Sequence, residues 1–174
     1  MERDLALLRP EFLSSLRAAV AAVHAHADGT FTLRAFCTRR DPWAQARLWR
    51  QSRSIEEVRI EITRLRNSNA PFLARVLEEV GPQHGRWATN AVPGLSWHQW
   101  CEACDLFVVE RSGAAIWRAN HPGYAMLREE SVARGLGVPL PIRDPYHVQR
   151  SVGSVLHYYG LAEVDAAMKE RYDE

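Results

Sequence analysis

The stretch Ser96–Val109, which reads SWHQWCEACDLFVV, decides the fold. Its last four residues, Leu106–Val109, form a short apolar run of the kind that makes a buried strand. Asp105 is therefore expected where that strand begins, and His98 precedes it by seven residues. An imidazole and a carboxylate at the entry to a strand can supply two of the three protein ligands that a catalytic zinc site takes.

A second polar pair follows later in the chain, where Asp144 stands three residues before His147. His147 can supply a third metal ligand, and the Asp144 carboxylate can take a proton from a metal-bound water. The sequence therefore predicts a zinc centre held by His98, Asp105 and His147, with Asp144 as the general base.

Elements on either side of these motifs indicate the fold class. Cap signals and apolar residues at helical spacing predict helices over about Pro10–Ala27, from Pro42, from Ile55, from Pro71 to a stop at Gly81, and over Pro122–Arg134, Val152–Tyr159 and Leu161–Tyr172. Short strands are expected at Phe31–Ala35, Leu106–Val109, Ala114–Trp117 and Tyr146–Gln149. Few strands among many helices, with no βαβ alternation, indicate an α+β fold with a small antiparallel sheet and flanking helices. No repeat or long linker appears, so residues 1–174 are expected to form one catalytic domain.

Composition narrows the choice of partners. Lys and Arg number 22 and Asp and Glu 21, so a net charge of +1 gives no electrostatic reason to expect a nucleic-acid partner. No apolar run reaches the roughly 18 residues of a membrane span. The start of the chain lacks the features of a signal peptide. We therefore expect a monomeric protein that is synthesised in the cytoplasm.

The cysteines allow a different interpretation. Cys101 and Cys104 form a C-x2-C pair that, with His98, could build a closed structural zinc site. Such a site needs a second closely spaced pair of Cys or His, which the sequence does not contain. A redox role is also disfavoured, because that pair would have to follow a strand in a βαβ unit.

The pattern Ser96-x-His98-x4-Ala103-x-Asp105, followed by Asp144-x-x-His147, resembles the zinc peptidases that cut the peptides of bacterial peptidoglycan. This group contains D-Ala-D-Ala carboxypeptidases and L-alanyl-D-glutamate endopeptidases, including phage endolysins. Two upstream segments add to the resemblance, which covers about Phe31–Gln149 in the expected order. They are the arginine segment, with Arg40, Gln45, Leu48 and Arg53, and the loop Thr89–Gly94.

The resemblance implies a fold of the D-Ala-D-Ala carboxypeptidase/hedgehog type that binds one Zn²⁺ through His98, Asp105 and His147. It implies that Asp144 is the base, that Arg40 stabilises an oxyanion or holds a substrate carboxylate, and that Ser96 contacts the substrate. The expected substrate is a peptidoglycan stem peptide, cut by an L-alanyl-D-glutamate endopeptidase of the endolysin kind that reaches the cell wall or periplasm after release. The alternatives are a D,D- or L,D-carboxypeptidase and a catalytically weakened cell-wall-binding homologue.

Two departures from the family pattern bear on activity. Cys101 occupies the position of the glycine in S-x-H-x-x-G-x-A-x-D. If that position needs a positive φ, any side chain there costs on the order of 1 kcal/mol or more. The second departure is Gly137–Pro141, where many relatives carry a Gly-Gly and Trp segment, and it leaves one side of the substrate groove unassigned.

Overall fold

A computed structural model describes residues 2–173 of the chain. The chain forms two compact units. The first contains Met1–Arg39 and Trp100–Gly153, and the second contains Arg40–Gln99 and Ser154–Glu174. Each unit is thus built from two separate stretches of sequence. The single catalytic domain expected over residues 1–174 stays a prediction.

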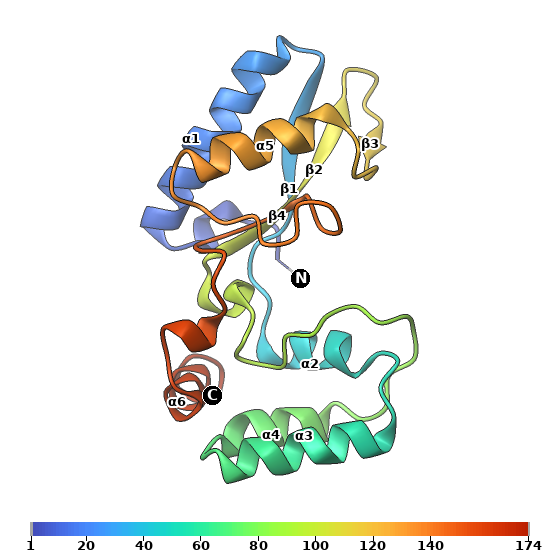
Figure 1. Cartoon of the computed structure of the whole chain (residues 1–174), viewed down its shortest axis with the longest axis vertical. Coiled ribbons are helices and arrows are strands. Elements are labelled where there is room, and N and C mark those ends of the chain that lie inside the picture. The colour runs from blue at the N-terminus through green and yellow to red at the C-terminus, as the bar shows by residue number, and fades with distance from the viewer. Residues whose placement is uncertain (1, 174) are drawn as a thin grey trace. The chain divides into compact units, whose positions relative to one another are not determined.

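The first unit is organised around a four-stranded antiparallel sheet. The strands are β1 (Phe31–Cys37), β2 (Ala103–Glu110), β3 (Ala115–Ile116) and β4 (His147–Gln149). All the others pair with β2. β1 pairs with β2 along nearly the whole length of β2, β3 pairs with the second half of β2, and β4 pairs with the first three residues of β2. β2 is therefore the strand that brings distant parts of the first unit together (Figure 1).

One face of this sheet forms the core of the first unit. Side chains alternate along a strand, and Cys104, Leu106 and Val108 of β2 point into a single hydrophobic cluster. Helices α1 (Pro10–Ala27) and α5 (Pro122–Val132) contribute apolar side chains to the same cluster. The short helix η1 (Leu5–Leu7) precedes α1 in the chain. Asp105 and Phe107 consequently belong to the opposite face of the sheet.

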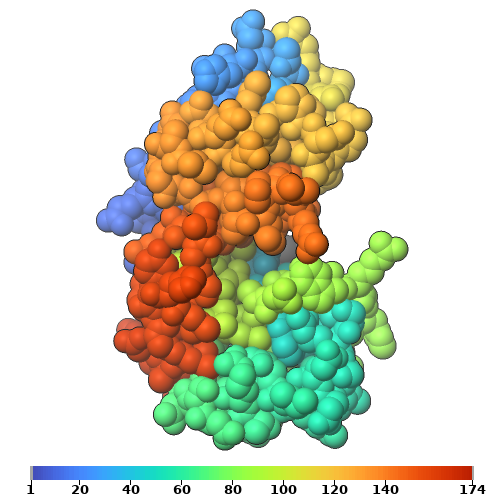
Figure 2. All heavy atoms as spheres, viewed as in Figure 1, coloured from blue at the N-terminus to red at the C-terminus, as the bar shows by residue number. Residues whose placement is uncertain are grey.

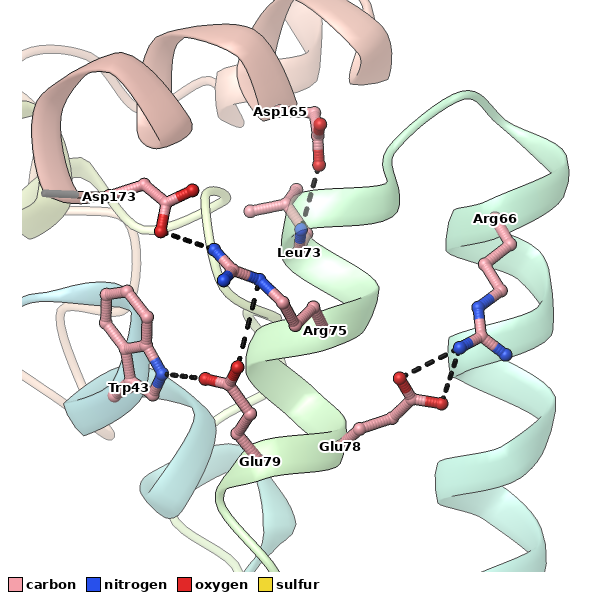
Figure 3. Close-up of polar contacts among 8 residues, drawn as sticks. All are labelled: Trp43, Arg66, Leu73, Arg75, Glu78, Glu79, Asp165 and Asp173. Carbon is pink, nitrogen blue, oxygen red and sulfur yellow. Dashed lines mark hydrogen bonds and ion pairs between the residues drawn. The ribbon is translucent and has the colours of Figure 1, made fainter.

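The second unit is helical. It contains α2 (Pro42–Arg50), α3 (Ile55–Asn67), α4 (Pro71–Glu79), η3 (Val155–His157) and α6 (Leu161–Tyr172), and η2 (Trp97–Trp100) starts in it. The capping box expected at Ser54 is present, with reciprocal bonds between Ser54 and Glu57. Helix α4 lacks a side-chain cap of its own. Instead, the buried Asp165 of α6 accepts a hydrogen bond of 2.8 Å from the amide of Leu73 (Figure 3).

Charged contacts on the surface of α4 join it to the neighbouring helices of its unit. Figure 3 shows Arg75 contacting both Glu79 and Asp173, and Glu78 accepting from Arg66 of α3. Glu79 also accepts a hydrogen bond of 2.8 Å from the indole of Trp43. These contacts are largely exposed, so packing of the apolar face of α4 contributes more to stability than they do.

The expected α+β class, with six α-helices and a small antiparallel sheet in the part of the chain that is described, is confirmed. The helix expected over Val152–Tyr159 is wrong. Only the single 3₁₀ turn η3 forms there, since Gly153 and Gly160 bound a segment too short for a stable α-helix. Among residues 2–173, no helix has both the length and the hydropathy to cross a membrane.

Candidate metal centre

The six residues singled out by the sequence divide between the two units. The first unit contains Asp105, Asp144 and His147. The second unit contains Arg40, Ser96 and His98.

In the first unit, β-sheet pairing brings Asp105 and His147 together across 42 residues of sequence. They are register partners in the β2–β4 ladder, and the His147 Nδ1 atom lies 2.7 Å from Asp105 Oδ1. Both side chains are 14 % exposed, so this pair is shielded but still accessible to solvent. The ladder therefore brings together two of the residues that the sequence motifs predict to be metal ligands.

Gln149 orients the His147 ring from the other side. Gln149 lies two residues further along β4 and so on the same face. Its amide nitrogen donates to the carbonyl of Ser151, which turns its Oε1 toward His147 Nε2 at 2.9 Å. His147 Nε2 therefore carries a proton and donates it, and a neutral ring then has its lone pair at Nδ1.

This tautomer has a consequence for Asp105. The Nδ1 lone pair of a neutral His147 and the Asp105 carboxylate are both acceptors, and they face each other at 2.7 Å. Two acceptors at that distance repel unless a proton or a metal cation lies between them. A metal-bound histidine typically donates its second ring N–H to a neighbouring oxygen. Gln149 Oε1 is such an oxygen for His147 Nε2.

Cys37 lies next to Asp105 on the other side. It ends β1 and is the register partner of Asp105, after an irregularity in the ladder between Ala35 and Cys37. Its thiol is buried. Within the first unit, Cys37 and Asp105 thus place a thiol and a carboxylate, two groups that can bind a metal ion, side by side. The sequence analysis missed Cys37, whose only signal was its place at the end of an alternating strand.

Asp144 lies in a turn of the first unit, just before β4. Its amide donates to the carbonyl of Leu140 at 2.8 Å, and its own carbonyl accepts from the amide of His147 at 3.3 Å. The phenol of Tyr146 reports the charges around it, because burial raises its pKa, and the carboxylates of Asp144 and then Asp105 raise it further. Both acids therefore lie within electrostatic reach of one hydroxyl, which sequence reasoning did not identify.

In the second unit, Arg40 is held by a relay of hydrogen bonds. Arg40 Nη1 donates to Gln45 Oε1 at 2.9 Å, and the fully buried Gln45 donates from Nε2 to the carbonyl of Ala91 at 2.7 Å. Arg53 Nη2 donates to the carbonyl of Thr89 at 2.9 Å. The arginine segment and the loop Thr89–Gly94, recognised separately in the sequence, are thus bonded to each other.

The turn that leads to Ser96 and His98 is fixed by Gln99. Its Oε1 accepts from the amides of Gly94 at 2.8 Å and Ser96 at 3.3 Å. Gly94 has a φ of 85°, and a Cβ added there would lie 2.5 Å from a methyl group of Val164, so only glycine fits. His98 follows this turn as a buried residue of η2.

Cys101 has a left-handed backbone, with a φ of 59°. A positive φ at the motif's glycine position carries a conformational cost for any residue with a side chain, and Cys101 has such a φ. The carbonyl of Cys101 accepts a hydrogen bond of 2.9 Å from the amide of Arg9, which ties the residue to the start of α1. An L-residue in this region costs roughly 1 kcal/mol compared with glycine.

The closed-site interpretation of Cys101 and Cys104 is not favoured by their environments. Cys104 points into the hydrophobic core, and burial raises the pKa of its thiol far above the usual range, with the charge of Asp105 adding to the effect. A thiol held protonated is a poor zinc ligand, because zinc binds the thiolate.

No protein-family model matches the chain, and no curated protein matches its sequence.

Proposed function

We propose that this protein is a zinc-dependent peptidase that hydrolyses peptidoglycan stem peptides, as an L-alanyl-D-glutamate endopeptidase. The observation that carries the proposal is the facing pair of Asp105 and His147, together with the hydrogen bond that Gln149 Oε1 accepts from His147 Nε2. The resemblance of the motifs names the reaction, and this pair supports the metal that the reaction requires.

The donor set fits zinc. His98, Asp105 and His147 would hold the ion as two imidazoles and one carboxylate, the set of N and O ligands that catalytic zinc sites use. A bound Zn²⁺ would lower the pKa of a coordinated water toward 7 and polarise the scissile carbonyl.

The remaining residues of the proposed site move the proton and hold the substrate. Asp144 accepts the proton of the attacking water and returns it to the nitrogen of the leaving group. The C–N bond therefore breaks with a neutral amine as the leaving group. Arg40 offers a permanently charged fork for the developing oxyanion or for a substrate carboxylate. Ser96 contacts the substrate peptide.

A digest of purified peptidoglycan tests the reaction. We expect new N-terminal D-glutamate, identified by mass spectrometry of the released fragments. Release of D-alanine would instead indicate a carboxypeptidase, and intact peptidoglycan with a zinc-loaded protein would indicate a binding homologue, which the strained Cys101 favours over the carboxypeptidase.

Metal analysis of purified variants tests the centre. His98→Ala and His147→Ala should each lose the one Zn²⁺ per chain, because an incomplete set of protein ligands binds zinc weakly. His26→Ala is the matched control, since His26 is an exposed residue of α1 that pairs with Glu130 outside this site. Undiminished zinc in both site variants would refute the assignment.

Cys37 needs its own variant, because it borders Asp105 on the side opposite His147. With the proposed ligands, Cys37→Ser keeps zinc near one per chain, and the cobalt-substituted protein shows no thiolate-to-metal charge-transfer absorption. Loss of metal in Cys37→Ser, with metal retained in His147→Ala, would replace His147 by Cys37 in the ligand set.

A further inference from the structure

The second unit has a surface cavity of about 350 Å³ that the proposed peptidase site does not use. It lies between the end of α2, the turn of residues 51–54, the start of α3 and the segment 82–85. The last of these segments belongs to the light green stretch that projects from the surface of this unit in Figure 2. The volume falls within the range of small-molecule binding sites.

The lining of this cavity is cationic. Arg50, Arg53 and His84 line it, and none of its lining residues is acidic. Arg50 makes one hydrogen bond of 2.8 Å, from Nη1 to the carbonyl of Leu77, and within residues 2–173 no carboxylate pairs with it. Burial lowers the pKa of Arg50. The charge of Arg50 is thus partly desolvated and is compensated by a carbonyl dipole instead of an anion.

The second guanidinium is fixed in place. Arg53 lies over the ring of Trp49, 4.2 Å from its centroid, and donates to the carbonyls of Trp49 and Thr89. Two acids lie within electrostatic reach of this guanidinium, because the charges of Glu57 and Glu61 raise the pKa of Arg53 while burial lowers it. Glu57 also accepts from the amide and hydroxyl of Ser54 at 2.7 and 2.8 Å, and Glu61 pairs with Arg64. In the described part of the chain, the positive charge at the cavity that no carboxylate balances is therefore that of Arg50.

The start of a helix also borders the cavity, at Ser54 and Ile55, where the 13-residue helix α3 begins. The first amides of a helix carry the positive end of its dipole. In α3 the amide of Glu57 donates to the Ser54 hydroxyl, and Glu56 and Glu57 lie in the first turn. Ser52, which also lines the cavity, holds a left-handed conformation with a φ of 60°, an unusual backbone for a non-glycine residue.

We propose that this cavity binds the phosphate group of a small organic phosphate. Guanidinium forks bind tetrahedral oxyanions with paired, charge-assisted hydrogen bonds, and a helix start is a frequent partner for phosphate. Two arginines and a histidine suit a doubly charged anion better than a single carboxylate. The cavity is larger than a bare phosphate, so the ligand carries an organic part beside it. This site does not depend on the proposed peptidase activity.

Titration of the ¹⁵N-labelled full chain with inorganic phosphate tests the proposal, with ionic strength held constant by sodium chloride. We expect saturable shifts of the amide signals of Ser52, Ile55 and His84. Acetate at the same ionic strength should bind at least about tenfold more weakly, since it offers one charge and fewer acceptors. Equal shifts with phosphate, acetate and chloride would overturn the proposal.

Charge variants locate the binding. Arg50→Gln should raise the phosphate Kd by about tenfold or more, and His84→Gln should raise it by a smaller factor. Arg47→Gln is the matched control, because Arg47 is an exposed arginine of the same helix outside the cavity. Arg50→Gln also removes the bond to Leu77, so His84→Gln keeps the test valid if the first variant unfolds. Equal weakening by Arg47→Gln, or no weakening by His84→Gln, would refute the site.

Discussion

Replacing Cys101 by glycine tests the link between the backbone and the motif. Cys101 has a φ of 59°, where an L-residue is disfavoured by roughly 1–2 kcal/mol. Cys101→Gly relieves that strain but gives the unfolded chain more freedom, at a cost of about 0.5–1 kcal/mol. The net change in the free energy of unfolding should therefore lie between zero and about +1.5 kcal/mol.

Cys101→Ala separates the two effects, because alanine removes the thiol and keeps the Cβ. We expect the alanine variant to be less stable than the glycine variant by about 1 kcal/mol in urea denaturation, with the slopes of the two transitions equal. Ser52→Gly and Ser52→Ala provide a matched pair at a φ of 60° in the other unit. They should repeat the difference in stability without changing zinc content or hydrolysis.

The same variant reports on the metal. Cys101→Gly should keep zinc at about one per chain and should raise peptidoglycan hydrolysis or leave it intact, since glycine is the residue of the resembling motif. A Cys101→Ala variant as stable as Cys101→Gly would contradict the positive φ. Loss of zinc in Cys101→Gly would mean that the thiol is a ligand, and the proposed peptidase centre would be wrong.

Three further predictions follow from individual contacts. Asp144→Asn should keep zinc bound and lower hydrolysis by at least the ~100-fold typical of a lost general base; more than a tenth of native activity with zinc present would refute that role. Asp165→Ala should lower the free energy of unfolding by about 2 kcal/mol, because it leaves the amide of Leu73 without its acceptor at the start of α4; Asp165→Asn, which keeps an acceptor, should cost less in the same denaturation assay. The hydrogen bonds from Ser54 lower the pKa of Glu57, so its contribution to stability is complete above the unfolded value of about 4.3 and is lost as the pH falls through the folded pKa. The stability difference between the native protein and Glu57→Gln should therefore vanish in acid, and a difference that grows there would contradict the prediction.

Local signals explain which parts of the fold the sequence predicts well. The capping box at Ser54 and the Asp41–Pro42 helix start each depend on residues within one turn, and both form as expected. Leu106–Val109 is apolar over consecutive positions and lies in β2, the strand that pairs with all the others. Such features need no knowledge of distant residues. The 3₁₀ turn η3 shows the limit, because apolar residues at helical spacing did not outweigh the glycines on both sides.

Strand register explains what the sequence does not predict. The place of Cys37 opposite Asp105 depends on the irregularity after Ala35, and a shift by one residue would turn the thiol to the other face of the sheet. Gln149 was overlooked for a related reason. Its role depends on sharing a face with His147 and on an amide orientation set by the carbonyl of Ser151. Neither relationship has a composition or spacing signal of its own.

The same register makes the proposed metal important for the fold as well as the reaction. β4 pairs with β2 over only three residues. One of these pairs is Asp105 of β2 and His147 of β4, which face each other as two acceptors when the ring is neutral. Without a proton or a metal cation between the two atoms, this contact opposes the pairing that creates it. A zinc ion bound by both side chains would convert the repulsion into a link between the strands. At a free zinc concentration one hundred times its Kd, binding would stabilise the native state by about 2.7 kcal/mol. Asp105 and His147, two of the proposed ligands that lie 42 residues apart in the sequence, would therefore be held together more firmly by the metal.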